Sequence, residues 1–436
     1  MPSALPLGDP APADGRLGEA ARAGLRGEPL GFYVHVPFCA SRCGYCDFNT
    51  YTATELGPGV SHGSYADTVL AEIHLARAVL PAAAPPVSTV FFGGGTPTLL
   101  PAEHLGVILK EIAGEFGLAP DAEVTTEANP ESVTPSYLAK LRDIGFNRIS
   151  LGMQSAVPRV LEVLDRKHRP ARAVAAVAEA RQAGFEHINL DLIYGTPLET
   201  DEDWRVSLET AIDTDVDHVS AYSLIVEEGT ALARQVATGV VPPPDDDVLA
   251  DRYLLADDLL AEAGYHWYEV SNWARSEAAQ CRHNQIYWSG GNWWGAGPGA
   301  HSHIGGTRWW NVKHPSRYAA ALDAGRSPAA GRETLNEEAL LTERLMLEVR
   351  MASGLDLNWL PEPATEHAEQ CVIWGLAERA PLGSGRLVLT QRGRLLADAV
   401  VRDLLDAVKL DAVKLNAVKL DAVKLDAVKL DAVKKD

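Results

Sequence analysis

The chain lacks the features that would place it in a membrane or on nucleic acid. None of its apolar runs approaches the ~18 residues needed to span a bilayer, and residues 1–30 are interrupted by proline, glycine and charges, unlike a signal peptide. Lys and Arg number 39 against 59 Asp and Glu, giving a net charge of −20. Because such a surface repels phosphate backbones, a broad nucleic-acid site is excluded. We expect a cytoplasmic protein with no nucleic-acid partner and no transmembrane segment.

Cysteine is also scarce, with five residues in 436. An odd number in a long chain without a secretion signal argues against a disulfide framework. Three of the five, Cys39, Cys43 and Cys46, lie within eight residues, whereas Cys281 and Cys371 are far away in the sequence. Chance is a poor explanation for this clustering, so it points to metal binding or redox chemistry.

Apolar, β-rich runs recur after residue 30, and each is followed by a segment of helical periodicity. The predicted strands are residues 32–36, 89–92, 123–126, 148–151, 188–193 and 219–224. The predicted helices are residues 65–80, 102–116, 135–144, 158–183, 201–212 and 245–263. Six such units in succession predict an α/β fold with a parallel sheet, open or curled into a barrel. In these folds the chemistry gathers at the carboxyl ends of the strands.

Composition divides the chain into five parts. Residues 1–30, rich in alanine, proline and glycine, are expected to form a disordered lead. Residues 31–263 hold the strand–helix units, and residues 264–330 form an aromatic segment with seven of the ten tryptophans. Residues 331–405 are predicted to be a smaller C-terminal domain, and residues 406–436 a repeat tail.

The tail repeats Asp-Ala-Val-Lys-Leu at five-residue steps from Asp406, with one Asn416 variant. Five residues advance a helix by about 140°, so the apolar positions spiral around it and form no stripe. In a strand, a five-residue period places the apolar positions of successive repeats on opposite faces. We interpret the tail as a passive repeat expansion without a chemical role, with an interaction handle as the alternative.

The cysteine segment reads Tyr-Val-His-Val-Pro-Phe-Cys-Ala-Ser-Arg-Cys-Gly-Tyr-Cys from Tyr33 to Cys46. Structural zinc is one interpretation, but it usually takes four protein ligands, often as two separated pairs. Three thiolates in one loop can instead hold three irons of a [4Fe-4S] cluster and leave the fourth iron open. We therefore predict Cys39, Cys43 and Cys46 as cluster ligands.

The Cys-x3-Cys-x2-Cys spacing, with an aromatic residue before the last cysteine, resembles the radical S-adenosylmethionine (SAM) superfamily. The resemblance implies a partial (β/α)6 barrel whose cysteine loop follows the first strand. It also implies that SAM chelates the open iron. An electron from the cluster then cleaves a carbon–sulfur bond of SAM and yields a 5′-deoxyadenosyl radical.

Residues at several predicted strand ends suit a bound nucleoside. The run Gly93-Gly94-Gly95-Thr96-Pro97 can bring bare backbone N–H and C=O groups close to a zwitterion, although a tight turn is the plainer interpretation. For the polar residues of the next three strands, capping or core hydrogen bonds are the alternative. The resemblance implies a SAM site made of Tyr33, Tyr45, Gly94, Gly95, Thr96, Glu127, Gln154, Arg166 and Asp191.

Two motifs resemble the branch named for oxygen-independent coproporphyrinogen III dehydrogenase, in its heme chaperone (HemW) type. The enzyme type has a fourth cysteine two residues after the third, where this chain has Phe48 in Cys-Asp-Phe-Asn. The chaperone type carries His-Asn-x-x-Tyr-Trp, which matches the segment from His283 to Trp288. Histidine is a common axial ligand of heme iron, so His283 is predicted to mark the heme site. An aromatic core whose histidines make ordinary hydrogen bonds is the alternative.

The resemblance implies a winged-helix-like, HemN-like C-terminal domain and a heme chaperone. Such a protein binds a [4Fe-4S] cluster, SAM and heme, and passes heme to an acceptor hemoprotein; an electron donor is needed if SAM is cleaved. The rival function is that of the dehydrogenase, which decarboxylates coproporphyrinogen III in porphyrin biosynthesis. A degenerate scaffold that keeps its cluster for stability is a third. No catalytic residue is assigned.

Overall fold

The computed structural model describes residues 7–57 and 59–409, which form two compact units. The first unit ends at Asn336 and the second begins at Glu337. Each has its own apolar core. The repeat tail from residue 410 onward lies outside the described residues, so its interpretation stays a prediction.

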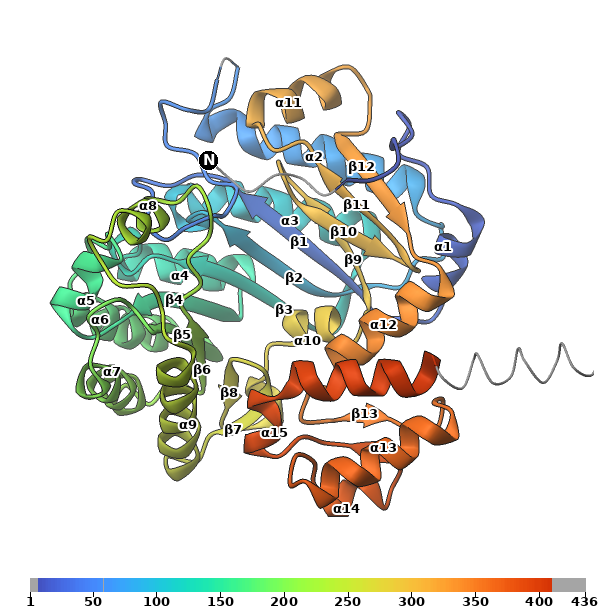
Figure 1. The fold of residues 1–436 in the computed structure, drawn as a ribbon. Helices are drawn as coiled ribbons and strands as arrows, with labels where there is room; N and C mark the ends of the chain where they lie inside the picture. Colours follow the sequence, from blue (N-terminus) through green and yellow to red (C-terminus); the bar gives the residue numbers. More distant parts are fainter. Residues whose placement is uncertain (1–6, 58, 410–436) are drawn as a thin grey trace, which may run out of the picture. The chain divides into compact units, whose positions relative to one another are not determined.

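A 12-stranded sheet organises the first unit (Figure 1). Its centre is six parallel strands that neighbour one another in chain order, which confirms the predicted α/β fold. These strands are β1 (Leu30–Val36), β2 (Val87–Gly94), β3 (Leu118–Ala128), β4 (Arg148–Gln154), β5 (His187–Tyr194) and β6 (His218–Ser223).

Further strands extend both edges of this parallel core. The strand β9 lies parallel beside β1, and β10, β11 and β12 then follow in antiparallel fashion. Beyond β6, the sheet ends with β8 and β7. The bounds of these strands are β7 (His266–Glu269), β8 (Asn272–Ala274), β9 (Asn292–Ala296), β10 (His301–Ile304), β11 (Thr307–Asn311) and β12 (Ala329–Thr334).

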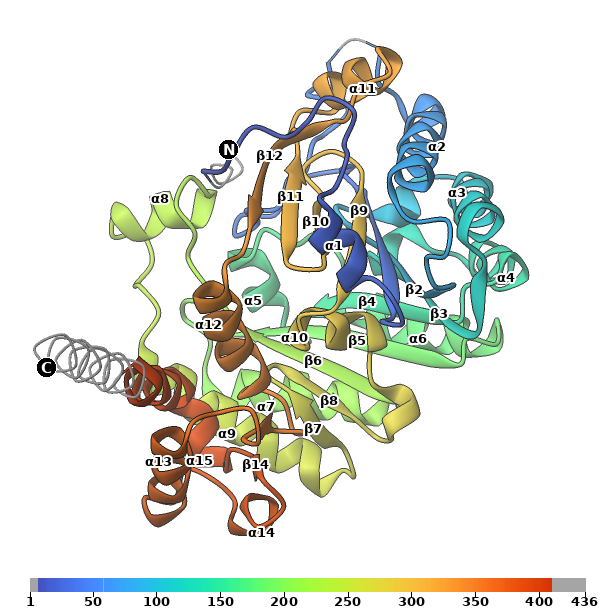
Figure 2. The same cartoon turned by 90° about the vertical axis from the view of Figure 1, so that its right-hand side faces the viewer.

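Helices that follow the six parallel strands cover the outer face of the sheet (Figures 1 and 2). They are α2 (His62–Val79), α3 (Ala102–Phe116), α4 (Pro135–Ile144), α6 (Pro170–Gln182), α7 (Asp201–Asp213) and α9 (Asp246–Glu262). The predicted helix over residues 158–183 is wrong, because the chain forms α5 (Pro158–Val163) and then α6. Between them, Asp165 takes a left-handed backbone with φ 54°, and Pro170 begins the new helix.

The two faces of the parallel strands have different environments. Outward side chains such as Phe32, Val90 and Leu151 are fully buried in the core beneath the helices. Inward side chains alternate with them and, from all six strands, line a single cavity of about 270 Å³. The sheet therefore curls around this cavity as a partial barrel.

Residues 7–30 differ from the expected disordered lead. They include the helix α1 (Glu19–Gly24), and Asp9 and Arg332 exchange backbone hydrogen bonds of 2.8 and 2.9 Å. Ala21 is only 1% exposed. Small residues allow this close packing, since a Cβ on Gly24 would lie 2.7 Å from the Cα of Gly305. The alanine- and glycine-rich composition here serves contact with the sheet.

The expected C-terminal domain boundary at residue 331 falls inside β12, which pairs with β11 and so belongs to the first unit. The second unit is a small helical domain with one two-stranded ribbon. Its elements are α12 (Glu337–Glu348), β13 (Leu355–Asp356), α13 (Glu362–Ile373), α14 (Arg379–Leu382), β14 (Arg386–Leu387), α15 (Gln391–Leu395) and helical residues 397–409. Cys371 is buried in its core. Within the described ranges, no helix is long and apolar enough to cross a bilayer.

The docking of residues 7–30 predicts that Gly24→Ala loosens this segment. The new Cβ would press on backbone at Gly305, and overpacking of this kind costs about 1–3 kcal/mol. We expect trypsin to cleave after Arg22 and Arg26 about fivefold to a hundredfold faster than in the wild type. Gly18→Ala is the matched control, because nothing lies within 4 Å of its Cβ position. Equal cleavage rates in the two variants would refute the docking.

Candidate functional site

The cysteine loop begins directly after β1 and is closed at its base. Cys39 N donates to Tyr51 O over 3.0 Å, and Tyr51 N donates to Pro37 O over 2.7 Å. The thiols of Cys39, Cys43 and Cys46 are partly exposed and form no disulfide. The loop thus presents three free thiols at the carboxyl end of the first strand, where the sequence predicts the chemistry.

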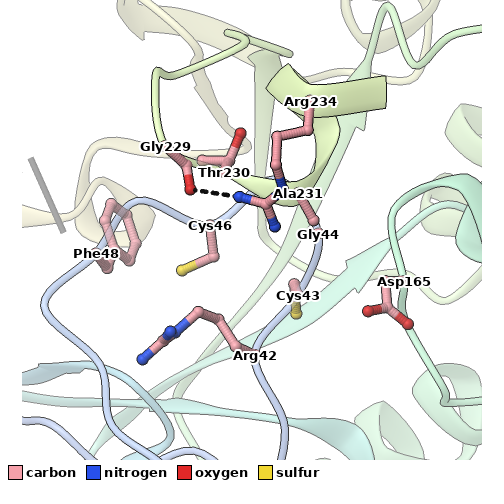
Figure 3. A pocket seen from close by; sticks show the side chains of 10 residues that line it. All are labelled: Arg42, Cys43, Gly44, Cys46, Phe48, Asp165, Gly229, Thr230, Ala231 and Arg234. Atoms are coloured by element: carbon pink, nitrogen blue, oxygen red, sulfur yellow. Dashed lines mark hydrogen bonds between the residues drawn. The ribbon is translucent and has the colours of Figure 1, made fainter. Parts of the chain in front are cut away.

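Cys43 and Cys46 face a cavity of about 240 Å³ (Figure 3). Its wall includes the loop residue Gly44 and the start of α8 (Ala231–Ala237). Gly44 N donates to Leu164 O over 3.2 Å, and Gly44 O accepts from Leu232 N over 2.9 Å. Neighbouring elements therefore hold the middle of the loop from two sides.

The charge around the thiols bears on metal binding. Burial raises the pKa of the Cys46 thiol to about 11 and also raises the pKa of Cys39. Arg166 Nη1 donates to Cys43 Sγ over 3.5 Å, so a cation lies beside this sulfur. Metals bind thiolates, so loading this site releases protons. Three reduced thiols beside one cation are a donor set suited to an iron–sulfur cluster.

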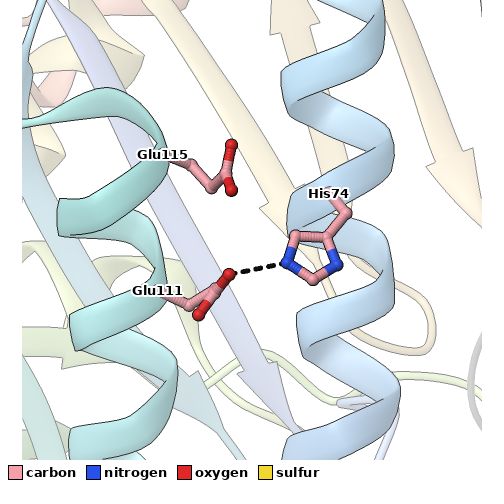
Figure 4. A group of neighbouring side chains, drawn as sticks. All are labelled: His74, Glu111 and Glu115. Atoms are coloured by element: carbon pink, nitrogen blue, oxygen red, sulfur yellow. Dashed lines mark hydrogen bonds and ion pairs between the residues drawn. The ribbon is translucent and has the colours of Figure 1, made fainter.

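A more compact group of potential metal ligands lies away from the cysteine loop (Figure 4). His74 of α2 and Glu111 and Glu115 of α3 have ligand atoms within 4.8 Å of one another. His74 Nε2 and Glu111 Oε1 are 2.6 Å apart. Among residues 7–57 and 59–409, no other such group occurs, so the three thiol sulfurs do not all lie within 4.8 Å of one another. A cubane tolerates this spacing because each thiolate binds a different iron.

The glycine run after β2 packs directly against the cysteine loop. Gly95 N donates to Val36 O over 2.8 Å, and Thr96 N donates to Phe38 O over 2.7 Å. Gly94 N donates to Glu127 Oε2 over 3.0 Å. These three N–H groups are engaged within the protein, so the N–H groups expected to meet a zwitterion are already used. The carbonyl groups are acceptors suited to an amino group.

Glu127 and Asp191 both line the interior cavity. Burial and, next, the nearby Asp191 raise the pKa of Glu127 to about 8, so its carboxyl is protonated at neutral pH. Asp191 accepts hydrogen bonds from Ser150 Oγ and Asn189 Nδ2, both over 2.7 Å, and burial raises its pKa as well. The two carboxyls give the cavity oxygen atoms that suit hydroxyl groups of a ligand.

Gln154 ends β4 with a left-handed backbone at φ 64°, next to a register shift between β4 and β5. A non-glycine residue in this region is strained and is often found at functional sites. Arg166 Nη2 donates to Gly152 O over 2.9 Å. A Cβ on Gly152 would lie 2.8 Å from Gln154 Nε2 and 3.1 Å from Arg166 Nη2, so the glycine keeps these two side chains together.

The two predicted tyrosines lie in different places. Tyr33 lines the interior cavity, and its hydroxyl is 3.0 Å from His35 Nδ1. Tyr45 packs against an apolar cluster that contains Val160 and Leu164, and burial raises the pKa of its hydroxyl. Of the residues predicted for SAM, the interior cavity therefore brings together Tyr33, Glu127 and Asp191, while Tyr45 stays with the cysteine loop.

The His-Asn-x-x-Tyr-Trp motif forms the short helix α10 (Arg282–Trp288), which packs against β2 and β9. Glu123 of β3 accepts from the backbone N–H groups of Arg282 and His283, each over 3.0 Å, and so caps the first turn. His283 Nδ1 lies 2.7 Å from Thr89 Oγ1, near the amino end of β2. The motif therefore closes the barrel at the end opposite the cysteine loop.

His283 is 1% exposed, and both of its ring nitrogens have partners. Besides the contact with Thr89, Nε2 lies 2.8 Å from the Tyr287 hydroxyl, and the ring stacks on Phe91 at 5.2 Å. Burial lowers its pKa to about 3, so the imidazole is neutral. Coordination of heme iron by His283 requires the exchange of one of these hydrogen bonds.

Sequence reasoning missed the polar inner face of the barrel. The cavity is also lined by Thr125, Arg148, Ser150, Asn189, His218, Ser220 and Tyr222. The signal was present, since polar residues occupy alternate positions in otherwise apolar strands, as in Arg148 and Ser150. A buried parallel strand normally reads as a continuous apolar run, so polar alternation there marks a polar interior.

A three-cysteine loop on the first strand of a partial barrel defines the class of radical SAM proteins, and a model of the Radical SAM superfamily matches residues 33–211. "Heme chaperone HemW" of Mycobacterium tuberculosis is 56% identical over 88% of this chain and 96% of that protein. The protein of that name from Synechocystis sp. is 36% identical over 79% and 83%. Coproporphyrinogen III oxidase (HemN) from Escherichia coli shares the fold, with TM-score 0.74 and 24% identity over 89% and 92%.

The chain belongs to the HemW family of the radical SAM superfamily. This confirms the family resemblance and the barrel predicted from the sequence.

The packing of the glycine run predicts that Gly95→Ala disturbs the cysteine loop. The new Cβ would lie 2.4 Å from Phe38 O, so the loop backbone must move. We expect less iron and sulfide per chain after anaerobic reconstitution, together with a stability loss of about 1–3 kcal/mol. Gly114→Ala is the control, since no atom lies within 4 Å of its Cβ position. Full cluster loading in Gly95→Ala would contradict the packing argument.

Proposed function

We propose that this protein is a heme chaperone that carries a [4Fe-4S] cluster and SAM, binds heme and transfers it to an acceptor hemoprotein. The observation that carries the proposal is the 56% identity to "Heme chaperone HemW" across 96% of that protein. The alignment covers 383 residues and so includes the α10 motif, and the Radical SAM match from residue 33 includes the cysteine loop. The neighbouring solved structure of HemN, at 24% identity, supports the fold alone.

Cys39, Cys43 and Cys46 would hold the cluster, and their three free thiols on one pinned loop fit it. Arg166 supports this fit, because its guanidinium reaches Cys43 Sγ and its Nε is buried without a hydrogen-bond partner. When bound, the cluster supplies an open iron and an electron. The chain's own part is to keep the thiols spaced and to place a cation beside them.

The residues around SAM would be those predicted from the resemblance. The carbonyls of Gly94 and Gly95 suit its amino group, because the N–H groups of this run are already engaged. Thr96 would lie beside them, although its carbonyl already accepts from Leu99 N over 3.0 Å. The protonated Glu127 and the hydrogen-bonded Asp191 are placed to meet hydroxyl groups. Productive use of SAM would require an electron donor, whereas binding alone would not.

The heme proposal rests on His283 as a neutral imidazole, which is the form that binds iron. Nε2 is held by the Tyr287 hydroxyl and Nδ1 by Thr89. Nε2 can be released by rotation of one tyrosine hydroxyl, whereas Nδ1 faces the barrel wall. Heme binding would therefore proceed with an opening of the α10 region that exposes Nε2.

The cluster assignment predicts that Cys43→Ser loses iron. A serine hydroxyl is a poor ligand for iron of a cluster, so we expect well under the about four irons per chain of a loaded [4Fe-4S] protein. Iron and acid-labile sulfide are measured after anaerobic reconstitution. Cys371→Ala, in the core of the second unit, is the control and should load fully. Full iron content in Cys43→Ser would remove Cys43 from the ligand set.

The heme assignment predicts opposite effects from two substitutions in α10. His283→Ala should abolish the Soret shift that accompanies axial ligation, whereas His266→Ala, an exposed histidine of β7, should leave it intact. Tyr287→Phe removes only the hydroxyl that occupies Nε2, so it should tighten heme binding by about two- to tenfold. Anaerobic heme titrations followed by absorbance measure both. An unchanged Soret band in His283→Ala would exclude this residue as the ligand.

A further inference from the structure

A histidine and two glutamates on neighbouring helices form the compact group of potential metal ligands shown in Figure 4. His74 lies in the second half of α2, and Glu111 and Glu115 lie in the last two turns of α3. Both glutamate side chains point from α3 toward the helix that carries the imidazole (Figure 4). One ligand atom from each residue lies within 4.8 Å of the other two, so a single cation can reach all three.

The protein compensates the negative charge of these two glutamates only in part. Carboxylates at positions i and i+4 of a helix repel each other. Glu115 also lies in the last turn of α3, where the helix dipole is negative and no basic residue occurs. In the part of the chain that the structure describes, Glu111 pairs with His74 alone, and the Glu115 carboxylate has neither an ion pair nor a hydrogen bond. The end of α3 therefore favours an added cation.

Arg77, the basic residue of α2 that lies near this end of α3, is directed elsewhere. Its Nη2 donates to Leu80 O over 3.1 Å and to Pro81 O over 2.6 Å. Its guanidinium lies over the Phe116 ring, 4.9 Å from the ring centroid. Arg77 therefore satisfies the backbone at the end of α2 and leaves the two glutamates to another cation.

The donor atoms indicate which metal the group suits. One imidazole nitrogen and two carboxylate oxygens are ligands typical of Zn²⁺, whereas Ca²⁺ and Mg²⁺ prefer oxygen ligands throughout. Tetrahedral zinc with bonds of about 2.0–2.2 Å places neighbouring ligand atoms about 3.4 Å apart. His74 Nε2 and Glu111 Oε1 are 2.6 Å apart, and all three ligand atoms lie within 4.8 Å, so small side-chain rotations give this spacing. The His74 side chain is 56% exposed, which leaves room for water as the fourth ligand.

We propose that His74, Glu111 and Glu115 form a zinc site that joins α2 to α3. Zinc replaces the contact between His74 and Glu111, which is a weak interaction at a solvent-exposed position. The site is separate from the cysteine loop. Because α2 connects the parallel strands β1 and β2, it runs antiparallel to them, and its second half lies toward their amino ends. The cysteine loop lies at the carboxyl end of β1.

The test is a calorimetric titration of Zn²⁺ into the full-length protein after anaerobic reconstitution, so that the thiols of the cysteine loop hold iron. We expect saturable binding of zinc, and binding of Ca²⁺ that is at least about tenfold weaker. His74→Ala removes the nitrogen ligand, and Glu115→Gln keeps the side-chain shape but removes the charge. Each should weaken zinc binding by at least about tenfold. Both variants should fold, because His74 is exposed and the Glu115 carboxylate has no partner among the described residues.

Two matched controls distinguish this site from zinc bound elsewhere on the surface. Glu103→Gln changes a glutamate at the other end of α3, which pairs with Lys140, and His266→Ala changes an exposed histidine of β7. Both should bind zinc as the wild type does. Equal zinc affinity in the wild type and in either His74→Ala or Glu115→Gln would overturn the proposal, as would the absence of saturable binding. Iron is measured after the titration, and a loss of iron equal to the bound zinc would assign the zinc to the cysteine loop and would likewise overturn it.

Discussion

The site at the carboxyl edge of the sheet depends on two backbone hydrogen bonds just beyond the β1–β2 pair. Gly95 N to Val36 O and Thr96 N to Phe38 O continue the strand pairing into the cysteine loop. A side chain at position 95 would collide with Phe38 O, so this approach requires glycine. These hydrogen bonds join the glycine run to the cysteine loop. They therefore fix the positions of the thiols, the carbonyls of residues 94–96 and Glu127 relative to one another.

A different interaction closes the other end of the barrel. Glu123 accepts the first N–H groups of α10, and His283 joins that helix to Thr89. The space between the two ends is polar, and burial keeps the carboxyl of Glu127 protonated near neutral pH. The interior of an acidic chain thus carries Arg148 as a cation, which forms an ion pair with Glu123 over 4.0 Å and donates to Ala279 O. The net charge of −20 therefore does not describe the barrel interior, where burial neutralises the Glu127 carboxyl and Arg148 is a cation.

Much of the fold follows from local periodicity. The helices α3 and α4 have the bounds predicted, and all six parallel strands lie where apolar β-rich runs occur. Periodicity failed where two helices with similar apolar spacing lie in succession, because Asp165 and Pro170 break the helix through backbone conformation. Composition gave the wrong prediction of disorder for residues 7–30, because alanine and glycine are common both in disordered segments and in closely packed ones. The contacts of this segment with β12 and with the turn between β10 and β11 decide between the two.

By itself the sequence determined the family, the three thiols on one loop and the order of strand and helix units. Each of these depends on a local pattern, either the spacing of a motif or the periodicity of neighbouring residues. Only the tertiary structure decided which distant groups meet. It placed His283 against Thr89 and Tyr287 at the closed end, and it aligned Tyr33, Phe91, Thr125 and Arg148 in one row. Such neighbours come from strand register and burial, and spacing along the chain does not encode either.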